Sequence, residues 1–119
     1  MSITREFALH FAGEWIAAWN AHDLERILSH YTDDFEMSSP LIVQIMGEPS
    51  GTLKGKSAIR AYWAKALVRL PELHFDFEEV LVGASSVVIL YRGSRGQSAE
   101  VFWFDAGNKI HRAAAHYPG

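Results

Sequence analysis

The stretch from Glu14 to Met37 constrains the fold of this chain more than any other part of the sequence. Leading into it, aromatic side chains recur every four residues, which is the spacing of one face of an α-helix. Residues 20–22 (NAH) break this helix, and Asp23 is a good N-cap for a second, short helix. Residues 32–34 (TDD) have turn chemistry, and Phe35–Ser38 then alternates as a strand does. The pattern predicts two helices on one core followed by a strand, with the first helix contributing Phe7, Phe11, Trp15 and Trp19.

The rest of the chain predicts one more helix and then four strands. Apolar residues at three- and four-residue spacing indicate a helix from about Lys56, and Pro71 lies just beyond its last turn. Residues 41–46 (LIVQIM) are apolar but precede a loop rich in glycine and proline, so they fit either a strand or a lid over a cavity. The later strands are expected at 74–82, 87–92, 98–104 and 110–117, separated by short turns.

This order of elements predicts an α+β protein in which a curved antiparallel sheet wraps around three N-terminal helices. A length of 119 residues fits a single domain spanning 1–119.

Composition narrows the class of function. A net charge of −3, with basic residues scattered along the chain, argues against nucleic acid as a partner. No segment approaches the roughly 18 consecutive apolar residues of a membrane span, and the first residues carry charges unlike a secretory signal, so we expect no membrane partner and a cytoplasmic location. The chain has no cysteine, and its histidines and acids lack metal-ligand spacing, so we expect no metal and no other cofactor.

Four segments carry a resemblance to a known family: residues 15–23 (WIAAWNAHD), 31–35 (YTDDF), 55–63 (GKSAIRAYW) and 107–110 (GNKI). With these segments at the joints between elements, the chain resembles the SnoaL-like branch of the NTF2-like superfamily over essentially its whole length. The resemblance implies a ketosteroid isomerase-like cone, also described as cystatin-like, with a hydrophobic pocket for a small organic molecule. It does not select one activity, because this fold carries isomerases, dehydratases, cyclases, hydrolases and plain binding domains.

The resemblance also implies where reactive groups lie. In the ketosteroid isomerase pattern, the base and tyrosine positions correspond here to Ser39 and Trp15, which cannot perform those roles, and only the acid position is retained, as Glu100. Strand alternation points Glu100, Phe102 and Phe104 into the pocket, and on the last strand His111, Ala113, Ala115 and Tyr117. We therefore expect Glu100 to act as acid or base, with His111 or Tyr117 as its partner, in an isomerase-, cyclase- or dehydratase-type proton transfer.

The remaining residues of the pocket are expected to bind ligand through aromatic and small side chains. Helical spacing favours a core role for Trp15, Trp19, Tyr62 and Trp63, with one or two of them also forming the pocket wall. The predicted ligand-binding residues are Trp15, Trp19, Ser39, Tyr62, Trp63, Phe102 and Phe104.

Two further expectations remain open at this point. The missing family acids favour an alternative function, a non-catalytic domain that binds a ligand or mediates dimerisation.

The strand alternation that points Glu100 inward also points Val101 and Trp103 outward, as part of an apolar patch. Together with the resemblance, that patch predicts a homodimer formed through the outer face of the sheet.

Overall fold

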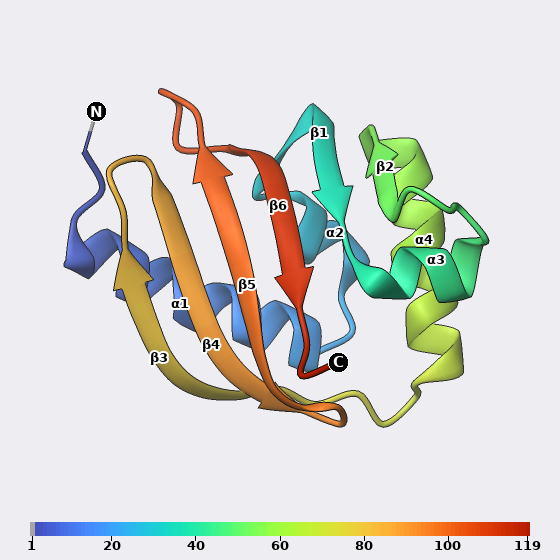
Figure 1. The fold of residues 1–119 in the computed structure, drawn as a ribbon. Helices are drawn as coiled ribbons and strands as arrows, with labels where there is room; N and C mark the ends of the chain where they lie inside the picture. The colour runs from blue at the N-terminus through green and yellow to red at the C-terminus, as the bar shows by residue number, and fades with distance from the viewer. Residues whose placement is uncertain (1) are drawn as a thin grey trace.

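A computed structural model describes residues 2–119 of the chain (Figure 1). Its helices are α1 (Arg5–Asn20), α2 (Leu24–Leu28), α3 (Pro40–Met46) and α4 (Lys56–Arg69). Its strands are β1 (Tyr31–Ser38), β2 (Thr52–Lys54), β3 (Asp76–Val82), β4 (Ser86–Gly93), β5 (Gly96–Phe104) and β6 (Ile110–His116). The α+β class is confirmed, and α3 is added to the three predicted helices.

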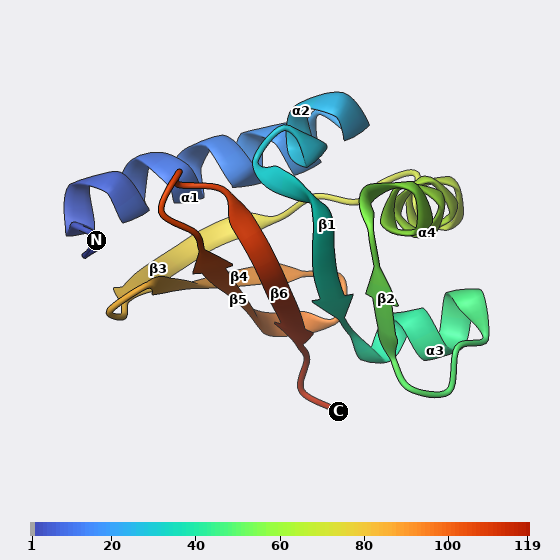
Figure 2. The same cartoon turned by 90° about the horizontal axis from the view of Figure 1, so that it is seen from above.

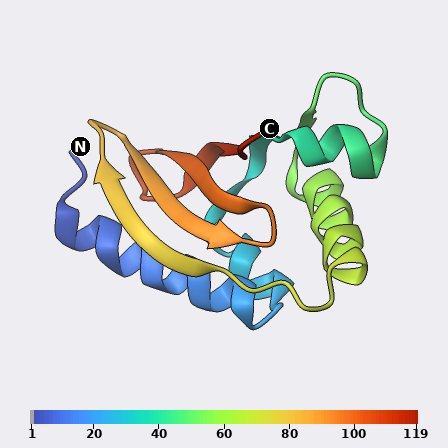
Figure 3. The same cartoon turned by 60° about the horizontal axis from the view of Figure 1, so that its bottom comes forward.

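The six strands form one sheet in the order β2-β1-β6-β5-β4-β3. Neighbouring strands are antiparallel, except that β1 and β6 run parallel in the middle of the sheet. Figure 2 shows α1 along one face of the sheet, while the other face of β4, β5 and β6 carries no helix. In Figure 3, β3 follows a curved path alongside α1, and the sheet as a whole is curved.

The polar residues that break the first helix also hold the segment between α4 and β3. The side chain of Asn20 accepts a hydrogen bond from the Phe75 backbone N–H at 2.7 Å and donates one to the Phe75 carbonyl at 3.0 Å. His22 adopts a left-handed backbone with φ of 55°. Its Nε2 lies 2.9 Å from the carbonyl oxygen of Leu73. The break after α1 therefore fixes residues 73–75 against the helix, where they form one wall of the site described below.

Two local predictions are wrong. Residues 41–46 form neither a strand nor a lid loop but most of helix α3, because helix signals surround them. The Ser39 side chain accepts from the Leu41 N–H at 3.1 Å, Pro40 occupies the first turn, and Gly47 ends the helix in the left-handed region. Residues 32–34 are not a separate turn but part of β1, whose pairing with β6 is irregular between Tyr31 and Glu36.

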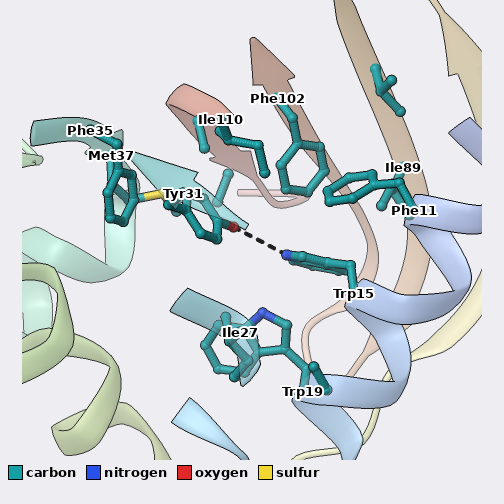
Figure 4. Packing of buried hydrophobic residues seen from close by; sticks show 14 of the residues in the cluster. Phe11, Trp15, Trp19, Ile27, Tyr31, Phe35, Met37, Ile89, Phe102 and Ile110 are labelled. Carbon is teal, nitrogen blue, oxygen red and sulfur yellow. Dashed lines mark hydrogen bonds between the residues drawn. The ribbon is translucent and has the colours of Figure 1, made fainter. Parts of the chain in front are cut away.

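The core lies between α1 and the concave face of the sheet and is mainly aromatic (Figure 4). Trp15 is its centre: the indole contacts the rings of Phe75, Tyr91 and Phe102 at centroid distances of 5.3–5.6 Å. Its Nε1 donates a buried hydrogen bond of 3.2 Å to the Tyr31 hydroxyl, which ties α1 to β1. Among residues 2–119, no helix is long and apolar enough to cross a membrane.

Candidate functional site

The site is built around Glu100, a carboxyl in the middle of β5. Strand alternation buries Glu100, Phe102 and Phe104 on the concave side of the sheet, as predicted, and Ser98 lies on the same side. Glu100 is only 4% exposed, and its strand neighbours are Ile89 on β4 and Ala115 on β6. The short side chain of Ala115 leaves room for the carboxyl beside it.

The environment of Glu100 favours its protonated form. Among residues 2–119, no lysine, arginine or histidine lies within ion-pairing distance of this carboxyl. In the described part of the chain, its side chain has one hydrogen-bond contact, from the Tyr91 hydroxyl 3.4 Å from Oε1. Burial raises the pKa of Glu100 from 4.5 to about 8, and the Tyr91 hydrogen bond only partly opposes that rise. The neutral form of Glu100 is therefore favoured at pH 7.

All four tyrosines of the chain lie around this carboxyl, although they come from four different elements or segments. Burial is the main cause that raises the pKa of each tyrosine, and a negative charge on Glu100 raises it further in every case. At neutral pH the hydroxyls are consequently uncharged and can donate hydrogen bonds. The four residues are Tyr31, Tyr62, Tyr91 and Tyr117.

Two adjoining cavities lead to Glu100. The inner cavity, about 50 Å³ in volume, is lined by Glu100 together with tryptophans of α1 and α4, and it can hold about one small group or a water molecule. The outer cavity has a volume of about 690 Å³ and is partly open to solvent. The two share a boundary of six residues: Leu41, Leu70, Leu73, Phe75, Tyr91 and Tyr117. A ligand in the outer cavity would reach Glu100 through this boundary.

The predicted ligand-binding residues fall into three groups. Those that line the inner cavity are Trp15, Trp19, Tyr62 and Trp63. Phe102 and Phe104 line neither cavity; they pack against Phe11 of α1, with centroid distances of 4.9 and 5.2 Å, and so belong to the core. Ser39 is 4% exposed and caps α3, and the Tyr62 hydroxyl lies 3.5 Å from its Oγ.

The two predicted partners of Glu100 end up in different places. Tyr117 lines both cavities. His111 is exposed and lines neither, so its predicted inward orientation is wrong. The cause is an irregularity between β5 and β6: Trp103 pairs with Arg112, but the next residue, Phe104, pairs with Ile110. This β-bulge leaves His111 unpaired and shifts the alternation along β6.

Sequence reasoning missed two contributors to the site. Tyr91 follows Val87 and Ile89 on the buried side of β4, so strand alternation alone could have identified it. Residues 70–73, which line the outer cavity, lie between α4 and β3 and follow no periodic pattern. In residues 2–119, no group of three or more histidine, aspartate or glutamate side chains is arranged to hold a metal ion.

Comparison with known proteins shows which family profile and which solved structures this chain matches. The profile of a family described as the SnoaL-like domain matches residues 12–115. A SnoaL-like protein of unknown function from Burkholderia thailandensis E264 is 55% identical, with a TM-score of 0.95 and full coverage of both chains. No curated protein matches the chain.

Two solved structures at lower identity share the fold alone. One is SalBIII, an epoxide hydrolase/cyclase-like enzyme in pyran ring formation in the polyether salinomycin, with 14% identity, a TM-score of 0.73 and coverage of 94% of this chain and 91% of SalBIII. The other is a protein of unknown function with a cystatin-like fold from Methylobium petroleophilum PM1. It has 16% identity and a TM-score of 0.76, and the match covers 100% of this chain and 80% of that one.

Proposed function

This chain belongs to the SnoaL-like domain family, and from that premise we propose that it catalyses proton transfer on a small, mostly apolar carbonyl compound, with Glu100 as the acid/base group. One observation carries the proposal: a carboxyl with no cationic partner in residues 2–119 is buried beside a small inner cavity that adjoins an outer cavity of ligand size. Burying such a group without a partner costs free energy, and buried carboxyls with raised pKa values are concentrated at functional sites.

The chemistry follows from the protonation states. The ionised fraction of Glu100 removes a proton from a carbon next to the ligand carbonyl, and the C–H electron pair becomes the enolate. The hydroxyls of Tyr91 and Tyr117 stay protonated, because burial raises both pKa values, and they donate hydrogen bonds to the enolate oxygen. Glu100 then returns the proton to the same carbon or to another one, which regenerates the carboxylate and gives exchange or isomerisation respectively.

The shared fold of SalBIII, an epoxide hydrolase/cyclase-like enzyme, is compatible with catalysis on organic molecules in this architecture. At 14% identity it says nothing about which residues react. The proposal therefore depends on the residues of this chain.

Deuterium exchange at the carbon next to the carbonyl of 2-tetralone tests the proposal, since this bicyclic ketone fits the outer cavity and needs no second substrate. We expect the protein to accelerate exchange measured by proton NMR in heavy water. The rate should rise with pH and level off above about pH 8, because the carboxylate is the reactive form. Glu100→Gln should reduce the acceleration at least about a hundredfold, whereas Glu36→Gln, which removes an exposed carboxyl on β1, should leave it unchanged.

Exchange that is unaffected by Glu100→Gln would refute the role of Glu100. Binding of the ketone without any acceleration would favour the second candidate, a non-catalytic ligand-binding domain. That candidate is supported by the use of Ser39, at the position of the family base, as a helix cap.

We also propose that the uncovered face of the sheet forms a homodimer. The row Leu81, Val88, Val101 and Ala114 crosses four strands on this face, as shown by the pairing of β3, β4, β5 and β6. Leu81 is 52% exposed. Trp103 lies on the same face, stacked under the guanidinium of Arg112 at 4.6 Å. An apolar row of this kind on one sheet face is typical of an interface between two copies.

A further inference from the structure

The rim of the outer cavity carries two arginines that have no acidic partner. Arg69 lies at the end of α4 and Arg95 in the turn between β4 and β5, and both line the cavity. Among residues 2–119, no carboxylate lies within ion-pairing distance of either guanidinium. Arg92 on the same hairpin differs, because it pairs with Glu78 at 3.5 Å and does not line the cavity.

Other charged groups at the rim leave a positive balance. Glu72 lines the cavity and contributes one negative charge, and His74 lies 3.3 Å from Asp76. Two guanidiniums against the one carboxylate of Glu72 give the cavity lining a net charge of +1. The whole chain has a net charge of −3, so the charge at the cavity is opposite in sign to that of the protein.

Arg95 is positioned over the ligand space. Its Nη2 donates to the Gln44 side-chain oxygen at 3.1 Å, and its Cζ lies 5.6 Å from the centre of the Tyr117 ring. Its charge also reaches inward: burial raises the pKa of Tyr62 to about 12, and Arg95 acts in the opposite direction. The bond to Gln44 uses only one of the five guanidinium N–H donors, so a fork that matches a carboxylate is still available.

Below the rim, the cavity is mainly apolar. Leu41, Leu70, Leu73 and Phe75 form its walls, and a volume of about 690 Å³ lies within the usual range for a small organic ligand. A molecule that fits this space is apolar along its length and negatively charged at the end that faces solvent.

From this geometry we propose that the ligand is an organic carboxylate, whose charged end is held by Arg95, assisted by Arg69, while its apolar body extends toward Glu100. This inference deepens the proposed function by naming the class of substrate. It rests on the proposed function only in assigning the reaction to the end of the ligand that lies toward Glu100. Arg95 is thus a specificity-determining residue and not part of the proton transfer.

A matched pair of probes tests the proposal: 2-naphthylacetate and its amide, 2-naphthylacetamide, which differ in charge but hardly in shape. Binding can be followed by tryptophan fluorescence, since Trp15, Trp19 and Trp63 line the inner cavity. We expect the carboxylate to bind about tenfold more tightly than the amide, which corresponds to roughly 1.4 kcal/mol, and we expect added salt to reduce the difference.

Arg95→Gln should lower the affinity for the carboxylate to about that for the amide and leave amide binding unchanged. Arg69→Gln should have a smaller effect in the same direction. Arg92→Gln is the matched control, because it removes the same charge from the same hairpin outside the cavity, and it should change neither affinity.

The proposal is overturned if the carboxylate binds no more tightly than the amide, including the case in which neither binds. It is also overturned if Arg92→Gln weakens carboxylate binding as much as Arg95→Gln, since a general field effect would then explain the preference. Comparing probe binding with ketone exchange, in the native protein and in Glu100→Gln, separates this proposal from the catalytic one. Discrimination between the probes without ketone exchange refutes only catalysis by Glu100, and exchange without discrimination refutes only the carboxylate site.

Discussion

Replacing Glu100 by glutamine should make the protein more stable at neutral and alkaline pH. The native carboxyl keeps its proton up to about pH 8, whereas an unfolded chain releases it near 4.5. Between these two values the native state binds more protons than the unfolded state, so the free energy of unfolding falls as pH rises. Glutamine resembles the protonated acid in shape and cannot ionise, so the variant escapes this loss.

The size of the effect follows from the two pKa values. The difference between 4.5 and about 8, at 1.36 kcal/mol for each pH unit, gives a maximum of about 5 kcal/mol above pH 8. Between pH 5 and pH 7 the same two values give roughly half of this maximum. Because Glu100 is only 4% exposed, solvent screening reduces this amount little.

Urea unfolding of the native protein and of Glu100→Gln at pH 5, 6, 7 and 8 measures the effect. The stability of the variant relative to the native protein should increase steadily over this range. The variant should also lose ketone exchange, so that stability and activity change in opposite directions at one residue.

A constant difference in stability across this pH range would refute the reasoning, because it would mean that Glu100 ionises similarly in the folded and unfolded states. Glu36→Gln provides the control, since it removes an exposed carboxyl from the same sheet. This control should follow the native pH dependence throughout.

Two further changes test other parts of the structure. Ser39→Ala removes the side-chain cap of α3, and thermal unfolding should show a loss of about 1 kcal/mol; an equal loss in Ser39→Thr, which keeps a capping hydroxyl, would contradict the capping role. Val101→Lys places a charge on the outer face of β5, and sedimentation equilibrium should show a dimer for the native protein and a monomer for the variant. A native monomer, or a variant that remains dimeric, would rule out the proposed interface.

The parts of the fold with strong periodicity could be predicted from sequence. The aromatic spacing in α1 and the run of β-branched and aromatic residues in β4 and β5 indicate the type of each element, and the buried positions alternate along both strands. Residues 41–46 were missed because a short apolar run fits several structures. There the decisive information lies in the flanking Ser39, Pro40 and Gly47, which together specify a helix start and a helix end.

The candidate site was predictable where a single strand determines it, as for Glu100 on β5. It was not predictable where the geometry depends on pairing between strands. The bulge opposite Trp103 and Phe104 changes which residues of β6 face inward, so His111 turns outward although simple alternation points it toward the pocket. The wall formed by residues 73–75 depends equally on distant contacts, which Asn20 and His22 make with Phe75 and Leu73.

The position of β6 has a consequence for the order in which this protein can assemble. It is the last of the six strands to be synthesised, yet it lies between β1 and β5 in the middle of the sheet. Until it emerges, the hairpins β3–β4 and β4–β5 can form, but β1 and β2 have no strand that joins them to the rest. Ala115 and Tyr117 belong to this segment, so the surroundings of Glu100 are complete only once β6 has paired with β5. Such dependence on distant parts of the chain slows folding, and here it makes completion of the site depend on the pairing of β6 with β1 and β5.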